Sequence, residues 1–583
     1  MNLKHQNQSR FRIVVGLLVL VCIALEGFAR SDDFEFGFVG GMGGIGTDYG
    51  YGIAVDEFGN AYTTGFFSIT ADFDPGVDTS TLTSVGGYEI FVQKLDAAGD
   101  LVWAKSMGGT GDDRGRDIAV DSSGNVYTTG FFSGSGDFDP GAGESILTLA
   151  GENDIFVSKL DTNGNLLWAA SFGDIESDEG RGIAVDASGN VYVTGYFDGT
   201  VDFDPGAGAF LVTSVGSRDI FVLKLDTAGN FLWVKTMGGP SYETARAITV
   251  DASGNIYLTG YFNDTVDFDP GAGTVNLTSA GDLEAFVCKL DSDGDFLWAK
   301  AMGGAELDYG RAIAVDGPGN VYTTGLFVGT ADFDPGAGTA MLTSAGGYDI
   351  FVLKLDSDGT FVWANRFGAV NEDYGNGIAV NASDHVYLTG TFTDTVDFDP
   401  SMDVADLTSA GSYEIFLQKL DSNGGLIWAT AMGADLDDFG FDLALGTSGR
   451  VYITGYFRKT VRFDPDMVAA DVVSAGLTDV FVLQYIDPSG SGSSLGPCLI
   501  EHVTSGTGLA HDLDSIRTFR DGQLLANSFG SVLAESYYRM SPDAVKWIDS
   551  KEKILREFVL AFIGIIISKV LVGLVRRWSA AHL

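Results

Sequence analysis

Residues 181–237 read RGIAVDASGNVYVTGYFDGTVDFDPGAGAFLVTSVGSRDIFVLKLDTAGNFLWVKTM, and this stretch decides the fold. Short runs rich in β-branched and aromatic residues alternate with turns that contain glycine. The runs lie at 181–186, 190–197, 219–226 and 230–235. A connection rich in glycine, proline and aspartate, 198–217, separates the second run from the third. This pattern predicts four strands of one antiparallel sheet.

The same pattern recurs every 65 residues along the chain, without an insertion or deletion. The tyrosine of the second strand recurs at Tyr62, Tyr127, Tyr192, Tyr257, Tyr322, Tyr387 and Tyr452. The tryptophan of the fourth strand recurs at Trp103, Trp168, Trp233, Trp298, Trp363 and Trp428. A repeat of this length is typical of a solenoid or a propeller.

The two ends of the repeat region favour the propeller. Phe36–Gly40 matches a fourth strand, whereas the last repeat stops after its third strand at Asp487. A solenoid would need dissimilar polar caps at its ends. We therefore predict an all-β protein with a seven-bladed β-propeller over 36–487, built from 65-residue, four-stranded blades and closed by the N-terminal strand.

The repeat resembles the SBBP type of bacterial β-propeller repeat. The resemblance lies in the segments 182–195, GIAVDASGNVYVTG, and 221–226, FVLKLD, and it extends over nearly the whole propeller. The Asp-Phe-Asp-Pro-Gly segment is an addition to that pattern. The resemblance implies a secreted or surface protein and assigns no catalytic residues.

Composition excludes several classes of function. The formal net charge is −45, and residues 31–497 alone carry −49, so binding to nucleic acid through its phosphates is excluded. Such a surface suits divalent cations or basic partners. The 3 cysteines cannot form a disulfide scaffold, and His385 is the only histidine within 36–487, so no Ser-His-Asp set or histidine metal centre is expected there.

Two sets of acids recur on the side of the propeller where we expect the longer connections. The first set occupies one position in every repeat and is a candidate ligand-binding set: Asp48, Asp113, Asp178, Glu243, Asp308, Asp373 and Asp438. The second set forms Asp-x-Asp pairs: Asp72 and Asp74, Asp137 and Asp139, Asp202 and Asp204, Asp267 and Asp269, Asp332 and Asp334, Asp397 and Asp399. Aspartates in such loops either accept backbone N–H groups in turns or bind calcium, and both interpretations stay open.

Basic and aromatic positions recur as well. Arginine stands three residues after the repeated acid at Arg116, Arg181, Arg246 and Arg311. This arc predicts either an ion pair or a hydrogen bond that orders the channel-side turn, or a site for an anionic ligand in the central channel. A lysine repeated from Lys94 to Lys419 is expected to point outward, and the tryptophans are expected to pack between neighbouring blades.

The two ends of the chain predict export and attachment. Residues 1–29 have the basic, apolar and small-residue regions of a secretory signal peptide. Residues 488–497 are a Gly/Ser linker, and 498–557 read as a helical region. Residues 558–575 form a hydrophobic helix that is either a membrane anchor or sorting tail, or a buried or amphipathic helix. The C-terminal region resembles one of exported bacterial proteins that opens Cys-Phe-Ile; the match lies at Cys498-Leu499-Ile500, 517–521 and Ser541-Pro542.

These observations predict an exported protein, extracellular or attached to the cell envelope. We expect a monomeric, non-enzymatic binding or scaffold module for an extracellular protein or a glycan, with no required cofactor and calcium as the candidate cation. The alternative is a carbohydrate-active enzyme that uses carboxylates on the acidic loop face.

Overall fold

The computed structural model describes residues 35–463 and 471–487. This part of the chain is built from β-strands, with a short 3₁₀ turn at Thr447–Gly449. None of its helical segments is long and apolar enough to cross a membrane. The predicted signal peptide, linker, helical C-terminal region and hydrophobic helix lie outside the described residues.

The repeat folds as one antiparallel sheet whose strands follow in chain order. Its strands are β12 (Glu179–Val185), β13 (Val191–Asp202), β14 (Leu211–Leu225) and β15 (Phe231–Met237). The four predicted strands are confirmed, but the long connection is more regular than expected. Beyond the sheet, β13 and β14 continue as a two-stranded arm in which Thr200 pairs with Thr213.

Equivalent sheets follow along the chain. They are β2 (Tyr49–Val55), β3 (Ala61–Asp72), β4 (Thr81–Leu95) and β5 (Leu101–Gly109); β6 (Arg114–Val120), β7 (Val126–Phe132), β10 (Asp154–Leu160) and β11 (Leu166–Phe172); β16 (Thr244–Val250), β17 (Ile256–Phe262), β20 (Glu284–Leu290) and β21 (Phe296–Gly304); β22 (Asp308–Val315), β23 (Val321–Phe327), β26 (Asp349–Leu355) and β27 (Phe361–Phe367); and β28 (Tyr374–Val380), β29 (Val386–Phe392), β32 (Glu414–Leu420) and β33 (Leu426–Met432).

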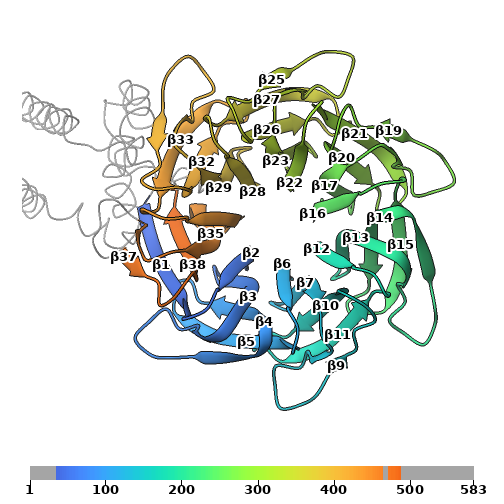
Figure 1. Cartoon of the computed structure of the whole chain (residues 1–583), viewed down its shortest axis with the longest axis vertical. Helices are drawn as coiled ribbons and strands as arrows, with labels where there is room; N and C mark the ends of the chain where they lie inside the picture. The colour runs from blue at the N-terminus through green and yellow to red at the C-terminus, as the bar shows by residue number, and fades with distance from the viewer. Residues whose placement is uncertain (1–34, 464–470, 488–583) are drawn as a thin grey trace, which may run out of the picture. The chain divides into compact units, whose positions relative to one another are not determined.

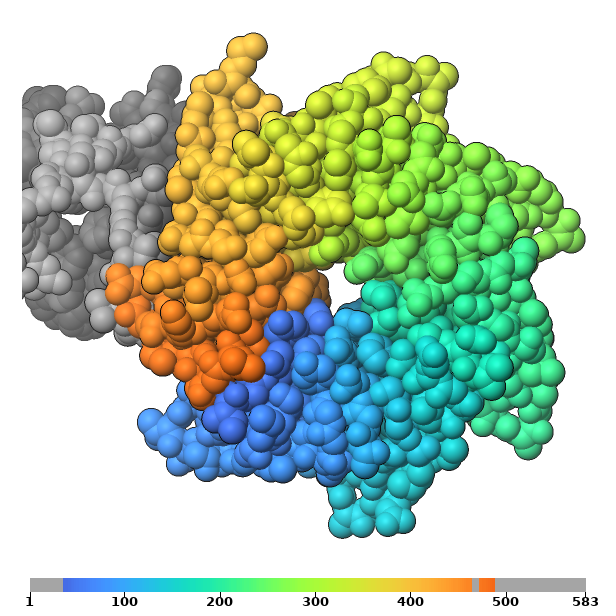
Figure 2. All heavy atoms as spheres, viewed as in Figure 1, coloured from blue at the N-terminus to red at the C-terminus, as the bar shows by residue number. Residues whose placement is uncertain are grey.

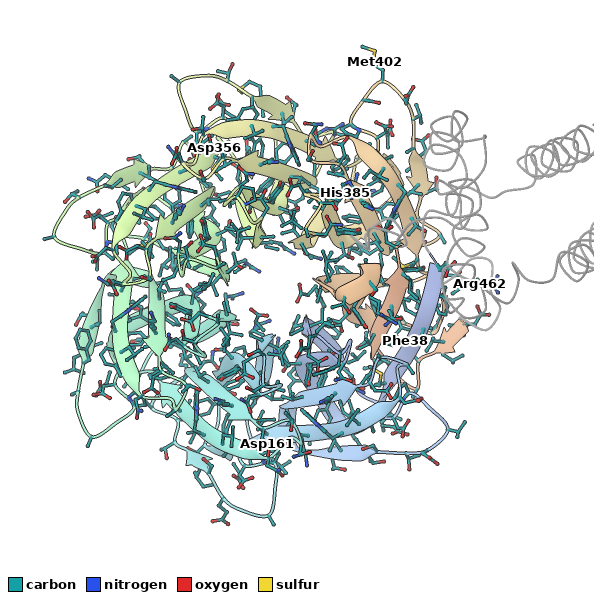
Figure 3. The ribbon with its side chains drawn as sticks, turned by 180° about the vertical axis from the view of Figure 1, so that it is seen from behind. Phe38, Asp161, Asp356, His385, Met402 and Arg462 are labelled. Atoms are coloured by element: carbon teal, nitrogen blue, oxygen red, sulfur yellow. The ribbon has the colours of Figure 1, made fainter. Side chains whose placement is uncertain are left out.

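In the second repeat and in the fourth to seventh, the arms are separate short strand pairs. They are β8 (Gly136–Asp137) with β9 (Ile146–Leu147), β18 (Thr265–Asp267) with β19 (Asn276–Thr278), β24 (Thr330–Asp332) with β25 (Met341–Thr343), β30 (Thr395–Asp397) with β31 (Asp406–Thr408), and β36 (Thr460–Arg462) with β37 (Asp471–Val473). Met402 lies at the tip of one arm and Arg462 on another, both at the outer edge of the sheets (Figure 3).

The first strand of the chain completes the last sheet. β1 (Glu35–Gly44) pairs antiparallel with β38 (Asp479–Ile486), which in turn pairs with β35 (Arg450–Phe457) and, beyond it, β34 (Phe439–Leu445). The predicted strand Phe36–Gly40 is therefore present in this place. The two strands lie side by side where the two ends of the coloured trace meet (Figure 1).

The sheets are arranged around a common centre (Figure 1), where the surface is hollowed (Figure 2). The innermost strands are β2, β6, β12, β16, β22, β28 and β34; each contacts the next, and β34 contacts β2. The apolar cores lie between successive sheets: Tyr62 and Ile90 of one sheet, for example, share a cluster with Ile118 and Phe132 of the next. Each sheet therefore buries its faces against its two neighbours.

One hairpin turn links each sheet to the preceding one. Trp168 Nε1 donates to the carbonyl of Thr227 in the next repeat at 3.2 Å, which confirms the predicted packing between repeats. Lys159 Nζ donates to the same carbonyl at 2.9 Å and lies 4.8 Å from the ring centroid of Tyr127. Gly229 has a φ of +82° and a Cβ there would lie 2.8 Å from Trp168, so the turn requires glycine.

The expected outward position of the lysines is wrong. Lys159, Lys224, Lys289, Lys354 and Lys419 are buried in the contact between sheets. A buried ammonium needs partners, and here the carbonyl of the neighbouring turn and the face of the tyrosine ring supply them.

The end of the described chain makes a stronger contact of the same kind. Lys419 Nζ lies 2.5 Å from Asp487 Oδ2, and the Tyr387 hydroxyl donates to the same oxygen at 2.5 Å. The side chains of Lys419 and Asp487 are fully buried. We predict that Lys419→Met lowers the free energy of unfolding by about 3–5 kcal/mol, because a buried carboxylate loses its cation.

The matched control is Lys354→Met, which removes a hydrogen bond of 3.2 Å to the neutral carbonyl of Ser422. Lys354→Met should lower the free energy of unfolding by only about 1 kcal/mol. Urea denaturation of both variants measures the difference, and equal losses would contradict a special contribution of the ion pair.

The pairing of β1 with β38 predicts that deleting residues 35–41 lowers the melting temperature sharply. The deletion removes the ladder from Glu35–Ile486 to Gly41–Phe481 and exposes the apolar edge of the last sheet. Differential scanning calorimetry of the shortened and complete chains tests this, and an unchanged melt would show that β1 adds nothing to the last sheet.

Candidate functional site

A β-bulge interrupts each innermost strand at the same place. In β12 the ladder to β13 shifts register between Gly180 and Gly182, which leaves Arg181 as the extra residue. The bulged residues of the seven inner strands form a set that we call the central ring: Tyr51, Arg116, Arg181, Arg246, Arg311, Asn376 and Phe441. A bulge re-aims a side chain out of the regular alternation, and bulges are frequent beside binding sites.

One side of the central ring is cationic. Arg116 Nε lies 2.5 Å and an Arg181 guanidinium nitrogen 2.8 Å from the two carboxylate oxygens of Glu179. Although burial favours the neutral acid, Arg181 and Arg116 lower the pKa of Glu179 to about 2. The predicted ion pair at this arc is therefore present for two of its four arginines.

The other two arginines have no carboxylate in ion-pair contact among the described residues. Arg311 donates to Asn376 Oδ1 at 2.5 Å, and Arg246 lies over the ring of Tyr261 at 5.7 Å. Burial, and then repulsion from Arg181 and Arg311, lowers the pKa of Arg246 to about 9. The Nε atoms of Arg181, Arg246 and Arg311 are buried and have no hydrogen-bond partner in the described structure. The arc thus carries more positive charge than Glu179 balances.

The other side of the central ring is aromatic. The ring centroids of Tyr51 and Phe441 lie 5.0 Å apart, and Arg116 covers Tyr51 at 4.9 Å, so the cationic and aromatic sides join. Tyr49 stacks on Tyr456 at 4.1 Å beside them. Tyr49, Tyr51 and Phe441 are partly exposed, so their faces are available at the centre.

The seven recurring acids lie at or just before the start of the inner strands, and none of them is exposed. Asp48, Asp113, Asp178, Glu243, Asp308, Asp373 and Asp438 are fully buried, so they do not offer exposed carboxylates to a ligand. Their oxygens bind backbone instead: Asp438 accepts the N–H groups of Ala434 and Arg458, both at 2.9 Å. These contacts hold the connection before the inner strand against the end of the second strand.

Each of these acids faces a second buried acid from the preceding repeat. The second set is Glu89, Asp154, Asp219, Glu284, Asp349, Glu414 and Asp479. We call the two sets the junction acids, paired as Glu89–Asp113, Asp154–Asp178, Asp219–Glu243, Glu284–Asp308, Asp349–Asp373, Glu414–Asp438 and Asp479–Asp48. Burial, with the charge of the pair partner, raises the pKa of Glu243 to about 8 and of Asp438 to about 7.

The Asp-x-Asp pairs close their own loops. Asp202 Oδ1 accepts the N–H groups of Asp204 at 3.1 Å and Phe210 at 2.7 Å, and Asp204 Oδ1 accepts that of Gly206 at 2.9 Å. Nowhere in 35–463 or 471–487 do three acid, histidine or cysteine side chains gather as a metal cluster. These hydrogen bonds are those of the turn interpretation; calcium at these loops stays a prediction.

Asp117 and Asp442, which sequence reasoning missed, lie one residue beyond the central ring. Asp117 Oδ2 accepts the N–H of Ile183 at 2.8 Å, and Asp442 Oδ2 that of Ile53 at 3.0 Å, so each links its strand to the next inner strand. Burial, and then the charge of Asp117, raises the pKa of Asp442 to about 8. A sequence indication did exist: this position holds glycine or alanine in the other repeats.

Comparison with known proteins identifies the repeat. The SBBP beta-propeller repeat matches residues 41–65, 102–130, 167–200 and 232–263, so the chain carries repeats of this type. An uncharacterized WD repeat-containing protein, L264, of Acanthamoeba polyphaga mimivirus is 24% identical over 443 residues, which cover 63% of this chain and 32% of that protein. The chain thus spans about a third of the length of this relative.

Solved structures of propellers are similar only at low identity. The WD40 repeats of RRP9 match with a TM-score of 0.39 and 9% identity over 78% of this chain and 99% of that one. The quinohemoprotein alcohol dehydrogenase ADHIIG of Pseudomonas putida HK5 matches with a TM-score of 0.36 and 13% identity over 80% and 78%. At these scores neither structure bears on the chemistry of this chain.

The raised pKa values of the junction acids predict a pH dependence in buffers that contain a chelator. Their folded pKa lies above the unfolded one, so the folded protein holds more protons between about pH 4 and 8, and stability should fall as the pH rises through that window. Turn acids such as Asp186 have a lowered pKa, so their contribution to stability rises with pH, but only at more acidic pH.

Glu243→Gln tests one junction acid directly. Glu243 Oε1 has no hydrogen-bond partner in the described structure, so an amide can take its place. The change should stabilise the fold at about pH 8.5 by about 2 kcal/mol and have little effect at about pH 5. The control is Glu57→Gln on an exposed turn. Destabilisation by Glu243→Gln at both pH values would contradict this account.

Proposed function

We propose that the chain is a secreted or surface-attached, monomeric, non-enzymatic binding module whose central ring binds an acidic glycan. The observation that carries this proposal is the division of the central ring into a cationic and an aromatic side. Guanidinium groups pair with carboxylate or sulfate in a bidentate manner, and aromatic faces pack on the apolar faces of flat rings. A neutral sugar would leave the guanidinium groups without an anion, and a simple anion would leave the aromatic faces uncovered.

The scaffold of this proposal is a closed, seven-bladed propeller. The pairing of β1 with β38 and the cycle of contacts among the inner strands support it. Closure brings Phe441 of the last repeat beside Tyr51 of the first, and so makes the aromatic side of the central ring.

Charge favours the centre as the place where an anion binds. The net charge of −45 repels anions from most of the surface, whereas Arg246 and Arg311 lack a carboxylate in ion-pair contact among the described residues. An acidic ligand therefore gains attraction only where it reaches these two side chains. The predicted signal peptide, 1–29, places such a module where extracellular glycans or proteins are its partners.

Catalysis by a carboxylate pair is the second candidate. Asp442 has a raised pKa and lies near Asp117, as the protonated acid of a glycosidase lies near a second carboxylate. However, both oxygens of Asp442 accept backbone N–H groups, from Ile53 and Leu443, so the side chain has no free oxygen to offer a substrate. We therefore favour binding without turnover.

Calorimetric titration with oligouronates, sulfated oligosaccharides and their neutral counterparts tests the proposal. We expect binding only of the acidic members, and Arg246→Gln should weaken it about tenfold. Phe441→Ala should weaken the binding of acidic sugars but leave the binding of inorganic sulfate unchanged. The control is Arg462→Gln, because Arg462 pairs with Asp471 on an outer arm.

Two outcomes would overturn the proposal. The central ring is not the site if Arg246→Gln and Arg462→Gln weaken binding equally or if neutral sugars bind as well as acidic ones. Release of shortened oligosaccharides that Asp442→Asn abolishes would instead establish the enzyme.

A further inference from the structure

A continuous row of aromatic side chains leads away from the central ring. The ring centroids of Tyr348 and Tyr374 lie 5.9 Å apart, and those of Tyr374 and Tyr413 lie 6.0 Å apart. Phe439 follows at 4.9 Å from Tyr413 and lies 5.9 Å from Phe441 of the central ring. All of these side chains are partly exposed. We call the row outside the central ring the aromatic arc; it consists of Tyr348, Tyr374, Tyr413 and Phe439.

The fold does not require the aromatic residues of this arc. Tyr348 and Tyr413 each stand directly before a junction acid, at a position that recurs in every repeat. The residues at that position are Tyr88, Asn153, Arg218, Leu283, Tyr348, Tyr413 and Thr478. Since asparagine, arginine and threonine occupy it in sheets with the same strand order, the sheet does not need a ring there. Partly exposed rings that the fold does not need favour contact with a ligand.

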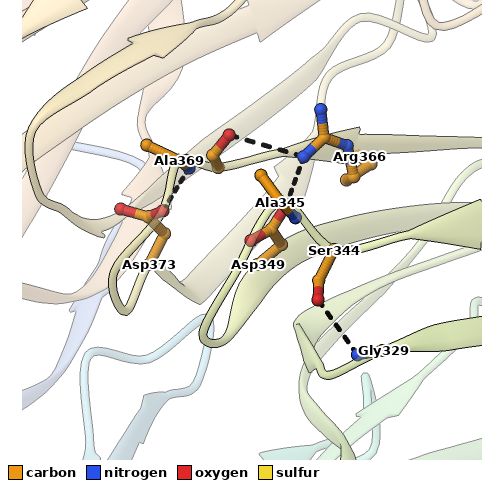
Figure 4. Close-up of polar contacts among 8 residues, drawn as sticks. Gly329, Ser344, Ala345, Asp349, Arg366, Ala369 and Asp373 are labelled. Carbon is orange, nitrogen blue, oxygen red and sulfur yellow. Dashed lines mark hydrogen bonds and ion pairs between the residues drawn. The ribbon is translucent and has the colours of Figure 1, made fainter.

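Buried groups hold the backbone that carries the arc. The N–H of Asp373 donates to the carbonyl of Tyr348 at 2.7 Å, and Arg366 pairs at 2.5 Å with Asp349, the partner of Asp373 (Figure 4). Asp349 directly follows Tyr348 in the chain. Asp373 directly precedes Tyr374, so these contacts hold the backbone of both tyrosines. A surface that is already ordered loses little entropy when it binds a ligand.

A carboxylate lies among the rings of the arc. The hydroxyl groups of Tyr374 and Tyr413 both donate to Glu372 Oε2, the second at 2.9 Å. Glu372 is partly exposed. Its charge repels an acidic sugar, whereas its oxygens can accept the hydroxyl groups of a neutral one. The arginines of the central ring have the opposite preference, so the two parts of this surface suit different sugars.

We propose that the aromatic arc binds neutral sugar units of the same chain whose acidic unit lies at the central ring. This inference rests on the proposed function and narrows its ligand to an oligosaccharide that contains both acidic and neutral sugars. The rings of the arc pack on the apolar faces of the neutral units, and Glu372 binds their hydroxyl groups. The arc extends from the fifth repeat to the seventh, so a single sugar cannot cover it.

Calorimetric titration of the complete chain with hyaluronan oligosaccharides tests this inference, because hyaluronan alternates an acidic sugar with a neutral one. The octasaccharide should bind at least about tenfold more tightly than the disaccharide, since its units engage both parts of the surface. Oligogalacturonates of the same lengths, in which every unit is acidic, should gain much less. They control for the larger number of acidic units in the longer chain.

Tyr413→Ala should weaken the octasaccharide about tenfold and leave the disaccharide unchanged. Tyr413→Phe keeps the ring and loses only the hydroxyl contact with Glu372, so it should weaken the octasaccharide less. The matched control is Phe58→Ala, because Phe58 is an exposed aromatic residue in the turn after β2, whereas the arc lies where the inner strands begin. Phe58→Ala should change neither affinity, and melting temperatures show whether each variant is folded.

The two proposals fail in different ways. Equal affinities for the two hyaluronan lengths, an equal gain with oligogalacturonates, or an octasaccharide affinity that Tyr413→Ala leaves unchanged would overturn the role of the arc. The central ring would remain the site in each case if Arg246→Gln still weakens the disaccharide. An Arg246→Gln variant that binds the disaccharide as tightly as the wild type would overturn the proposed function, and this inference with it.

Discussion

Contact between successive sheets is the constraint on which this structure depends, because no sheet can bury both of its faces alone. An apolar core lies between each pair of sheets, and at one turn the tryptophan and lysine of one repeat also donate to the same carbonyl of the next. The turn glycine must sit directly against the indole ring. An inserted residue within this turn would move it away from the indole ring.

The residues at the centre of the molecule vary among the repeats, whereas those between the sheets do not. The junction acids, the arms and the turns recur almost without change, since each must fit an identical neighbour. The side chains of the central ring contact unlike partners in the neighbouring sheets: Arg116 pairs with Glu179, and Arg311 with Asn376. The central ring itself changes from arginine to asparagine to aromatic residues. Difference among repeats therefore identifies the candidate site better than repetition does.

The sequence predicted the strands, the place of Phe36–Gly40 and the tryptophan contact, because alternation and spacing encode them directly. It did not predict that Lys159 is buried, since that depends on a carbonyl 68 residues away. Nor did it predict the bulge at Arg181, because the alternation of apolar and polar residues in a short strand does not reveal one extra residue. It did not predict the pairing of the junction acids, because the two acids of each pair belong to different repeats.

The pairing of β1 with β38 also sets the order in which the molecule can be completed. β1 is made first, but its ladder to β38 cannot form until residues 479–486 are made, and until then β38 has only β35 beside it. Joining ends so far apart carries a loop-closure entropy that earlier, local sheets avoid. Until then the nascent chain carries an unpaired edge at each end, and two incomplete molecules present matching edges to one another. A crowded population of unfinished chains would thus exchange first strands and assemble as intertwined dimers.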